Sequence, residues 1–445
     1  MLERLDLPSA ALLAGWPVRP RALRLDMPPE RCLMHLAARL GALNQLVLII
    51  AVAVTNNRRR PMNIRFSVPS GDFIEHIQER KPLLMKSAAF TAGFSWCDVN
   101  EIIARSDPAS EDFKLTYDGV RPKAEYVESY LDVGMLRHRL IKPVVYDYLR
   151  KGGTLIANKI SNEAKVHAFS KCVADYTHRR VVSSLYVAFG TKSSHRCHWD
   201  TRDVFAVQLI GRKRWTLYEP SLEAPLYTQQ SKDYEHLYPC PPDSKMDVVL
   251  EAGDVLYVPR GWWHNPLPLG EASVHLALGT FPAYAVDYLG WTLSKMSAFL
   301  PARKALLDWR QDEDTVSMLA RRIAESLRDR ENYDRFMDSF IGAARVESPL
   351  AIEIFADASI DGVGEHVGLR IASDASPFRR SLDCIIANGT KVNLDEQGRR
   401  IIQSIASTPG ITSADLVEQH PDLDADKLRC VITELCRQDV LELIR

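Results

Sequence analysis

Apolar and polar residues alternate with a period of two through the middle of the chain. The alternating runs are short, and Gly, Pro and Asp residues separate them. Six runs follow one another: VVSSLYVAFG, DVFAVQLIG, KRWTLYEP, DVVLEAGDVLYVPRG, WWHNPLPL and ASVHLALGTF. No helical stretch long enough for a parallel crossover lies between them, so the pattern predicts an antiparallel barrel or a two-sheet jelly roll.

The period changes to that of an amphipathic helix after about residue 285. Apolar residues recur at spacings of three and four in VDYLGWTLSKMSAFL, DTVSMLARRIAESLRD and YDRFMDSFIGAARV, which predicts a helical region. From about residue 380 the order is helix, turn, helix and strand, as in a winged helix, with Thr412 and the acidic residues 422–426 placed to cap helices. We therefore expect a mixed α+β fold: a jelly-roll domain over 62–285, a helical region over 286–379 whose apolar stripes form core or dimer surface, and a winged-helix-like domain over 380–445.

Residues 1–61 differ in composition from the rest. They contain nine Arg and no Lys, and they end in TNNRRRP. We expect a poorly ordered extension, or residues upstream of a natural start at Met62, and assign this segment no function.

Charge and cysteine usage exclude several partner classes. The chain has 56 Lys and Arg against 57 Asp and Glu, so no global field favours nucleic acid or an anionic membrane. Residues 397–445 hold six basic and eight acidic residues, which favours a protein contact over DNA binding. The eight cysteines form no Cys-x-x-Cys motif, and the most apolar stretch is too short to span a bilayer. We expect a cytoplasmic protein.

The stretch HRCHWDTRDVFAVQLIGRKRW places His198 and Asp200 two residues apart in a β pattern. Alternate residues of a strand share a face, so both side chains point inward. About 1.5 His-x-acid pairs arise by chance in this composition, and His420 with Asp422 is such a decoy in a polar turn. His264 follows a second strand in GDVLYVPRGWWH. Two His and one carboxylate leave open coordination positions, which suits non-haem Fe(II).

A lysine lies in the strand that follows the first histidine. Lys213 alternates with Trp215 and Leu217, so it is predicted to point into the core, where an ammonium group needs an anion. Tyr186, in SSLYVAF, is placed to donate a hydroxyl hydrogen bond to the same anion.

These three motifs together resemble those of the JmjC hydroxylases of the cupin superfamily, closest to the ribosomal oxygenase branch. The resemblance covers roughly residues 70–285. It implies that His198, Asp200 and His264 ligate Fe(II) and that Lys213 binds the distal carboxylate of 2-oxoglutarate with help from Tyr186. It also implies that His275 lies near the active centre, that O2 is consumed, and that a side chain of a ribosomal protein or of a peptide natural product is hydroxylated. Ser184 departs from the family, where several members have Asn.

Other functions remain open at this point. A catalytically inactive cupin could act as a dimeric scaffold or regulator through its winged helix. The same chemistry could also act on a free amino acid or small metabolite, or remove a methyl group from N-methyl-lysine. The intact metal trio and the acidic last domain favour the enzyme.

Overall fold

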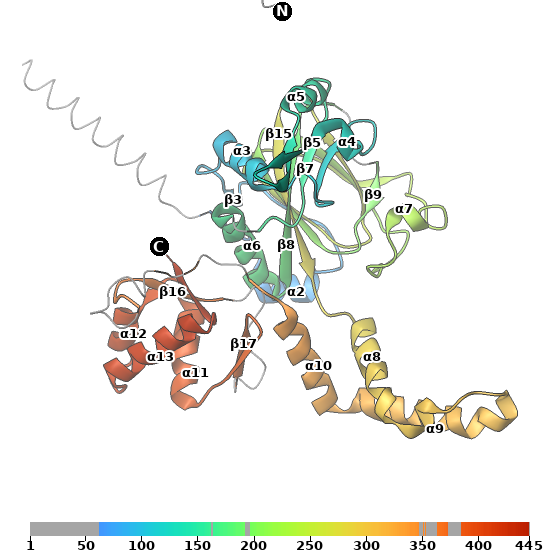
Figure 1. Cartoon of the computed structure of the whole chain (residues 1–445), viewed down its shortest axis with the longest axis vertical. Coiled ribbons are helices and arrows are strands. Elements are labelled where there is room, and N and C mark those ends of the chain that lie inside the picture. The colour runs from blue at the N-terminus through green and yellow to red at the C-terminus, as the bar shows by residue number, and fades with distance from the viewer. Residues whose placement is uncertain are drawn as a thin grey trace, which may run out of the picture. The chain divides into compact units, whose positions relative to one another are not determined.

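The computed structural model describes residues 62–161, 163–191, 196–346, 350, 352, 363–372 and 384–444. The expectation for residues 1–61 lies outside this range. Two antiparallel sheets form the centre of the domain that precedes residue 285 (Figure 1). The larger sheet contains, in spatial order, β2 (Leu83–Met85), β13 (Val255–Val258), β10 (Val204–Ile210), β15 (Ser273–Phe281), β8 (Arg180–Ala188), β7 (Thr154–Ala157) and β4 (Phe113–Thr116). The smaller sheet contains β12 (Ser244–Leu250), β11 (Lys213–Tyr218), β14 (Trp263–Pro268) and β9 (His198–Trp199).

Five of the six alternating runs each form one strand, and the run DVVLEAGDVLYVPRG forms two. Gly253 adopts a φ of +97°, a conformation that favours glycine. The turn there sends β12 to the smaller sheet and β13 to the larger one. The alternation alone gave no sign of this change of sheet, because both halves of the run read as strand.

The central strand β10 is buried on both faces. Phe205, Val207 and Leu209 belong to a core that also includes residues of helix α6 (Ala164–Thr177), which packs on β8. Ala206, on the opposite face of β10, packs with Trp215 of β11 in a separate cluster between the two sheets. Burial on both faces explains why this strand reads as a continuous apolar run.

The domain also contains two separate two-stranded sheets and several helices. The short strands are β1 (Asn63–Ile64), which pairs with β3 (Ala89–Phe90), and β5 (Val127–Asp132), which pairs with β6 (Met135–Leu140). The helices are α2 (Ser70–His76), α3 (Trp96–Arg105), α4 (Lys123–Tyr126), α5 (Lys142–Arg150) and α7 (Ser231–Tyr234).

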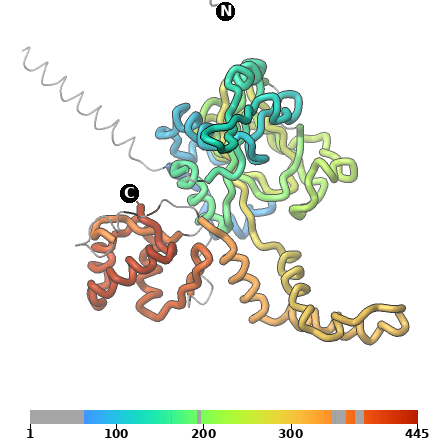
Figure 2. Tube along the Cα trace, in the orientation of Figure 1, coloured from blue at the N-terminus to red at the C-terminus, as the bar shows by residue number. Residues whose placement is uncertain are grey.

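Between residues 285 and 343 the regular elements are helices, as expected, and they can be followed in Figure 2. They are α8 (Ala285–Ser294), the 3-10 turns η1 (Lys295–Ala298) and η2 (Leu300–Arg303), α9 (Trp309–Arg328) and α10 (Arg330–Ala343). Asn332 of α10 donates to Thr292 Oγ1 of α8 at 3.2 Å, so the three helices pack as one group. The expected helical range of 286–379 also contains the strand β16 (Gly368–Ile371), which pairs with strands of the last part. None of the described helices is both long and apolar enough to cross a membrane.

The last part has its own core. The sheet β19 (Ile411–Thr412), β16 (Gly368–Ile371) and β20 (Leu441–Ile444) accompanies the hairpin β17 (Cys384–Ala387) and β18 (Thr390–Asn393) and the helices α11 (Glu396–Ser407), α12 (Ser413–Gln419) and α13 (Ala425–Arg437). As expected, Thr412 caps α12 and accepts from Asp415 N at 3.1 Å. Asp424 likewise caps α13, accepting from Lys427 N at 2.8 Å.

Candidate active site

Two of the predicted ligands are direct cross-strand neighbours. His198 of β9 pairs with His264 of β14, and the next pair along is Trp199 with Trp263. The two tryptophans lie on the opposite face, where their rings meet edge to face at 4.7 Å. Because alternate residues of a strand point to opposite faces, this buried Trp pair leaves both histidines directed between the sheets.

Each histidine is held in one tautomer. His198 Nδ1 donates to the carbonyl oxygen of Arg196 at 2.8 Å, and His264 Nδ1 donates to that of Trp262 at 3.0 Å. A neutral imidazole that donates from Nδ1 carries its lone pair on Nε2. Backbone acceptors of this kind orient metal-binding histidines in known sites, so both rings offer Nε2 to the same space.

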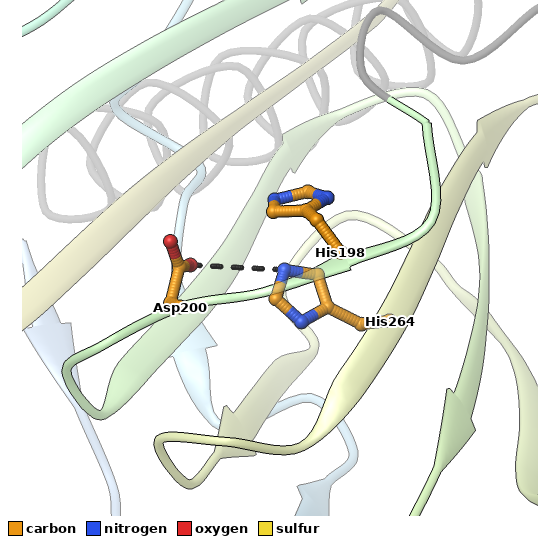
Figure 3. A group of neighbouring side chains, drawn as sticks. All are labelled: His198, Asp200 and His264. Atoms are coloured by element: carbon orange, nitrogen blue, oxygen red, sulfur yellow. Dashed lines mark ion pairs between the residues drawn. The ribbon is translucent and has the colours of Figure 1, made fainter. Parts of the chain in front are cut away.

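Asp200 completes the group that sequence analysis predicted. Its Oδ2 lies 3.7 Å from His264 Nε2 (Figure 3), and the rings of His198 and His264 are 4.3 Å apart. One ligand atom from each of the three residues lies within 4.8 Å of the others. Neighbouring ligands on an octahedral ion at about 2.1 Å are roughly 3 Å apart. The donor types and spacing therefore fit a divalent ion after a small inward movement.

The segment that carries Asp200 is tied to the turn before His264. Gly261 N donates to Asp200 O at 2.9 Å, and Arg260 N donates to the buried carboxylate of Asp203 at 2.9 Å. Asp203 also accepts from Tyr257 Oη at 2.8 Å. Sequence analysis missed this support, since an Asp in a loop gives no sign of which distant backbone it will bind.

Lys213 is buried, 3% exposed, and crosses the space between the sheets. Its Nζ lies 3.1 Å from Nδ1 of His275, although Lys213 belongs to β11 of the smaller sheet and His275 to β15 of the larger one. Among the described residues no carboxylate forms an ion pair with Lys213. Burial lowers the pKa of this ammonium group to about 7, because the charged form loses its hydration.

Tyr186 lies beside His275 on the neighbouring strand. The two residues are register partners, and their rings stack with centroids 4.8 Å apart. Burial raises the pKa of Tyr186 to about 12, and the Asp200 carboxylate contributes to the rise. The hydroxyl thus remains a hydrogen-bond donor at neutral pH.

All six predicted site residues line one cavity of about 530 Å³. Trp215 lies between the trio His198, Asp200 and His264 and the residues around Lys213. The centroid of its ring is 5.8 Å from that of His264 and 5.6 Å from that of His275. Ser184 and Arg202 line the same cavity. Arg202 was not predicted as a site residue, because an arginine between two aspartates reads as a solvated charge.

The decoy in the last domain has a structural role. His420 Nδ1 lies 3.2 Å from Arg400 Nη2 and its Nε2 lies 3.0 Å from Ser404 Oγ. Arg400 also binds Asp422. Both ring nitrogens of His420 are engaged, so the motif spacing alone did not identify a ligand pair.

Comparison with known proteins supports this picture. Residues 156–288 match the model of the JmjC domain. The bifunctional lysine-specific demethylase and histidyl-hydroxylase NO66 of Drosophila simulans is 27% identical over 250 residues, which are 55% of this chain and 28% of that protein. The protein of the same name from Drosophila erecta is 30% identical over 158 residues, 35% of this chain and 24% of that protein. The chain thus spans well under half the length of these curated relatives.

Among solved structures, the ribosomal oxygenase YcfD from Escherichia coli has a similar fold. One structure gives a TM-score of 0.54 at 16% identity and covers 87% of this chain and 100% of YcfD. A second, in complex with cobalt and 2-oxoglutarate, gives 0.55 at 17% identity and covers 86% and 100%. Residues 156–288 are therefore similar to the JmjC domain, and the chain shares its fold with YcfD.

Proposed function

We propose that this protein is an Fe(II)- and 2-oxoglutarate-dependent oxygenase that hydroxylates a side chain of a protein or peptide. The observation that carries the proposal is the convergence of His198, Asp200 and His264 in the cavity that also contains the buried Lys213. The comparisons agree with it, since relatives are described as an oxygenase in complex with 2-oxoglutarate and as a histidyl-hydroxylase.

In this proposal His198, Asp200 and His264 hold Fe(II) and leave adjacent coordination positions open. When bound, the iron together with 2-oxoglutarate and O2 supplies the oxidising chemistry that inserts oxygen into a C–H bond. The protein's own residues bind the iron and 2-oxoglutarate, orient them and enclose the site. Two fixed imidazole tautomers and one carboxylate set the direction in which the open positions face.

Lys213 binds the distal carboxylate of 2-oxoglutarate. His275 Nδ1 accepts a hydrogen bond from its ammonium group and so directs the remaining N–H bonds toward the co-substrate. Tyr186, kept protonated by burial, is a second donor at the same end of the cavity. Lys213 is buried, and the limited access of water to its ammonium group strengthens the ion pair between lysine and carboxylate.

A protein or peptide substrate is favoured over a small metabolite by the shape of the site. The cavity that contains the trio shares Asp112, Asn158 and Lys159 with an adjoining hollow beside α3. An extended chain that places one side chain in the cavity could continue along this hollow. The names of the relatives point in the same direction.

The proposal includes finer features of architecture. The two sheets would close as a double-stranded β-helix over residues 62–285, the helices of 286–379 would form a homodimer, and residues 380–445 would be a winged helix that binds protein and not nucleic acid. A cytoplasmic location is part of the same proposal.

The test is turnover of the full-length protein. Purified protein with Fe(II), 2-oxoglutarate and a protein extract should form succinate and yield a peptide heavier by one oxygen. His198→Ala and Asp200→Ala should each lose metal binding and turnover but keep the wild-type melting curve in the presence of a chelator. Lys213→Ala should keep the metal and need about tenfold or more 2-oxoglutarate, as expected for loss of a charge-assisted pair.

Absence of succinate with every extract, while the protein binds metal and 2-oxoglutarate, would overturn the proposed oxygenase. Unchanged dependence on 2-oxoglutarate in Lys213→Ala would overturn the role given to this lysine.

A further inference from the structure

Arg202 is placed in the cavity by the shape of its surroundings. It follows Asp200 by two residues, and its side chain lies across β15. At Gly279 a Cβ would come within 3.0 Å of Arg202 Cδ and Nε, so the guanidinium stem occupies the space that only glycine leaves open. The guanidinium carbon lies 5.4 Å from the centroid of the Phe281 ring, a distance at which a cation is attracted by an aromatic face.

No acidic residue among the described ones forms an ion pair with Arg202. Two other cations that line the cavity are paired: Lys159 with Asp112 at 3.1 Å and Arg196 with Glu235 at 2.6 Å. Lys114 and Lys232 also line it and, like Arg202, make no ion pair within the described part of the chain. Besides Lys213, the cavity thus has three cations that form no ion pair with a carboxylate of the described residues.

Arg202 lies away from the end that would hold 2-oxoglutarate. Lys114 does not, because the strand register places it in one cross-strand row with Tyr186 and His275. His275, Ala277, Gly279 and Phe281 follow one face of β15, and all four line the cavity. Four residues of strand at about 3.4 Å each put Gly279 roughly 14 Å from His275, the partner of Lys213. An anion held by Arg202 would therefore be a different molecule from the co-substrate.

The net charge at the proposed iron centre also indicates that Arg202 would bind an anion other than the co-substrate. Fe(II), the Asp200 carboxylate, the 2-oxoglutarate dianion and protonated Lys213 together carry no net charge. The positive charge of Arg202 is left over when cofactor and co-substrate are bound. A substrate with a carboxylate near the target residue would compensate it, and the fork of the guanidinium can bind a carboxylate through two parallel hydrogen bonds.

We infer that the substrate is an acidic peptide segment, whose carboxylate Arg202 binds at the Gly279 end of the cavity, with Lys114 and Lys232 adding to the attraction. This inference rests on the proposed function, because the peptide is a substrate only if the protein is an oxygenase. Binding of the peptide can be measured without turnover. A peptide suits the site better than a nucleic acid, because three cations within a single cavity cannot follow a run of phosphates, and the whole chain has a net charge of −1.

The experiment compares two fluorescein-labelled random peptide libraries. One has Asp and Glu at fixed positions and the other has Asn and Gln there, and anisotropy measures their binding to the full-length protein at low salt. The acidic library should bind at least about fivefold more tightly. Arg202→Gln should abolish that preference. Arg139→Gln, the matched control, removes an exposed arginine on β6 that pairs with Glu128 outside the cavity and should leave the preference unchanged.

Gly279→Ala separates local geometry from net charge. The added methyl group requires the Arg202 side chain to shift by a few tenths of an ångström, so the preference should fall, by less than in Arg202→Gln, although no charge changes. Equal binding of both libraries, or a preference that survives Arg202→Gln, would overturn the inference. Tighter, Arg202-dependent binding of a labelled oligothymidylate would overturn the peptide assignment. Succinate formation, measured separately, tests the proposed oxygenase. A failure of the peptide-binding prediction can therefore be distinguished from a failure of the proposed function.

Discussion

The most unusual single residue in the site is Lys213. With its ordinary pKa of 10.5 a lysine is charged at neutral pH, but this one is buried between two sheets. Its neighbour His275 is a hydrogen-bond acceptor and not a counter-ion. Because burial brings the pKa to about 7, the free protein holds this lysine near its point of half protonation at neutral pH. A dicarboxylate that binds there must therefore bind to molecules in which Lys213 is already protonated, or cause Lys213 to take up a proton.

Binding of 2-oxoglutarate should therefore take up a proton. At about pH 8 most of the free protein has neutral Lys213, and the bound carboxylate raises its pKa, so uptake should approach one proton per site and decline below about pH 6. Calorimetry of the metal-loaded protein without oxygen, in buffers of different ionisation enthalpy, measures this. Lys213→Met should remove the uptake, and proton release on binding would contradict the assignment.

The same pKa fixes a stability trend for the protein without ligands. Between about pH 7 and 10.5 the unfolded chain binds a proton at Lys213 that the folded chain does not, so this residue makes the free energy of unfolding rise with pH across that window. Lys213→Met should flatten the rise in chemical denaturation. An unchanged slope would mean that the lysine stays charged when buried.

A pair of thiols lies beside the first proposed ligand. Cys197 Sγ is 3.6 Å from Cys240 Sγ, and burial raises the pKa of Cys197 to about 12 and raises that of Cys240 as well. Diamide, which accepts two electrons and two protons, should couple them to a disulfide slowly at pH 7 and faster as pH rises, because the thiolate is the reactive form. Peptide mapping should find this link, and Cys240→Ser should prevent it. A link from Cys197 to another cysteine would contradict the pairing.

At the scale of elements, the site depends on where two loops meet. The loop after β9 carries Asp200, and the turn before β14 leads to His264. Gly261 in that turn has a φ of +83°, and a Cβ there would lie 2.8 Å from Leu222 O and from Pro225 Cδ. The hydrogen bond from Gly261 N to Asp200 O thus needs glycine for both conformation and space.

Gly261→Ala should strain this turn and shift Asp200 relative to His264. We expect a loss of roughly 1–3 kcal/mol in the free energy of unfolding, together with weaker metal binding. Calorimetric titration with Mn(II), used as a probe, and denaturant unfolding measure the two effects. Gly270→Ala, also at positive φ but beside the Thr191 side chain, is a control for strain alone and should keep metal affinity. Equal loss of affinity in both variants would contradict the specific role of Gly261.

The elements that could be predicted from sequence are those with a local signal. Short β-type runs bounded by Gly, Pro and Asp identified β8, β10 and β15. The inward direction of His198 and Lys213 followed from the alternation of side chains along a strand. What the sequence could not supply were contacts between distant loops, such as Asp203 with the turn at Arg260, and the room that Gly279 leaves for Arg202. Those depend on tertiary packing, which no local pattern encodes.

At the scale of the whole molecule, apolar surface is concentrated in the helical region. Leu306, Leu307 and Trp309 are 63%, 76% and 66% exposed at the start of α9. Three neighbouring large apolar side chains in water are typical of a surface that another protein covers. A second copy of this chain is the partner that the proposed dimer supplies.

Light scattering should give twice the chain mass of 50.2 kDa. The double variant Leu307→Glu and Trp309→Glu should reduce this to the monomer without changing the melting of the JmjC domain, since both side chains are exposed. Leu131→Glu, at an equally exposed position on β5, is the matched control and should stay dimeric. A monomeric wild type would rule out the dimer.

The pairing of β9 with β14 has a consequence for how the edge of the smaller sheet holds together. β9 has only two residues and lies at the end of the sheet, where few backbone hydrogen bonds resist opening. One ion bound to His198 and His264 would bridge these two strands, so metal occupancy would set the opening rate of this edge. Amide hydrogens of residues 197–200 would then exchange with solvent fastest in the metal-free protein, and the entry of iron would be the last step in completing the sheet.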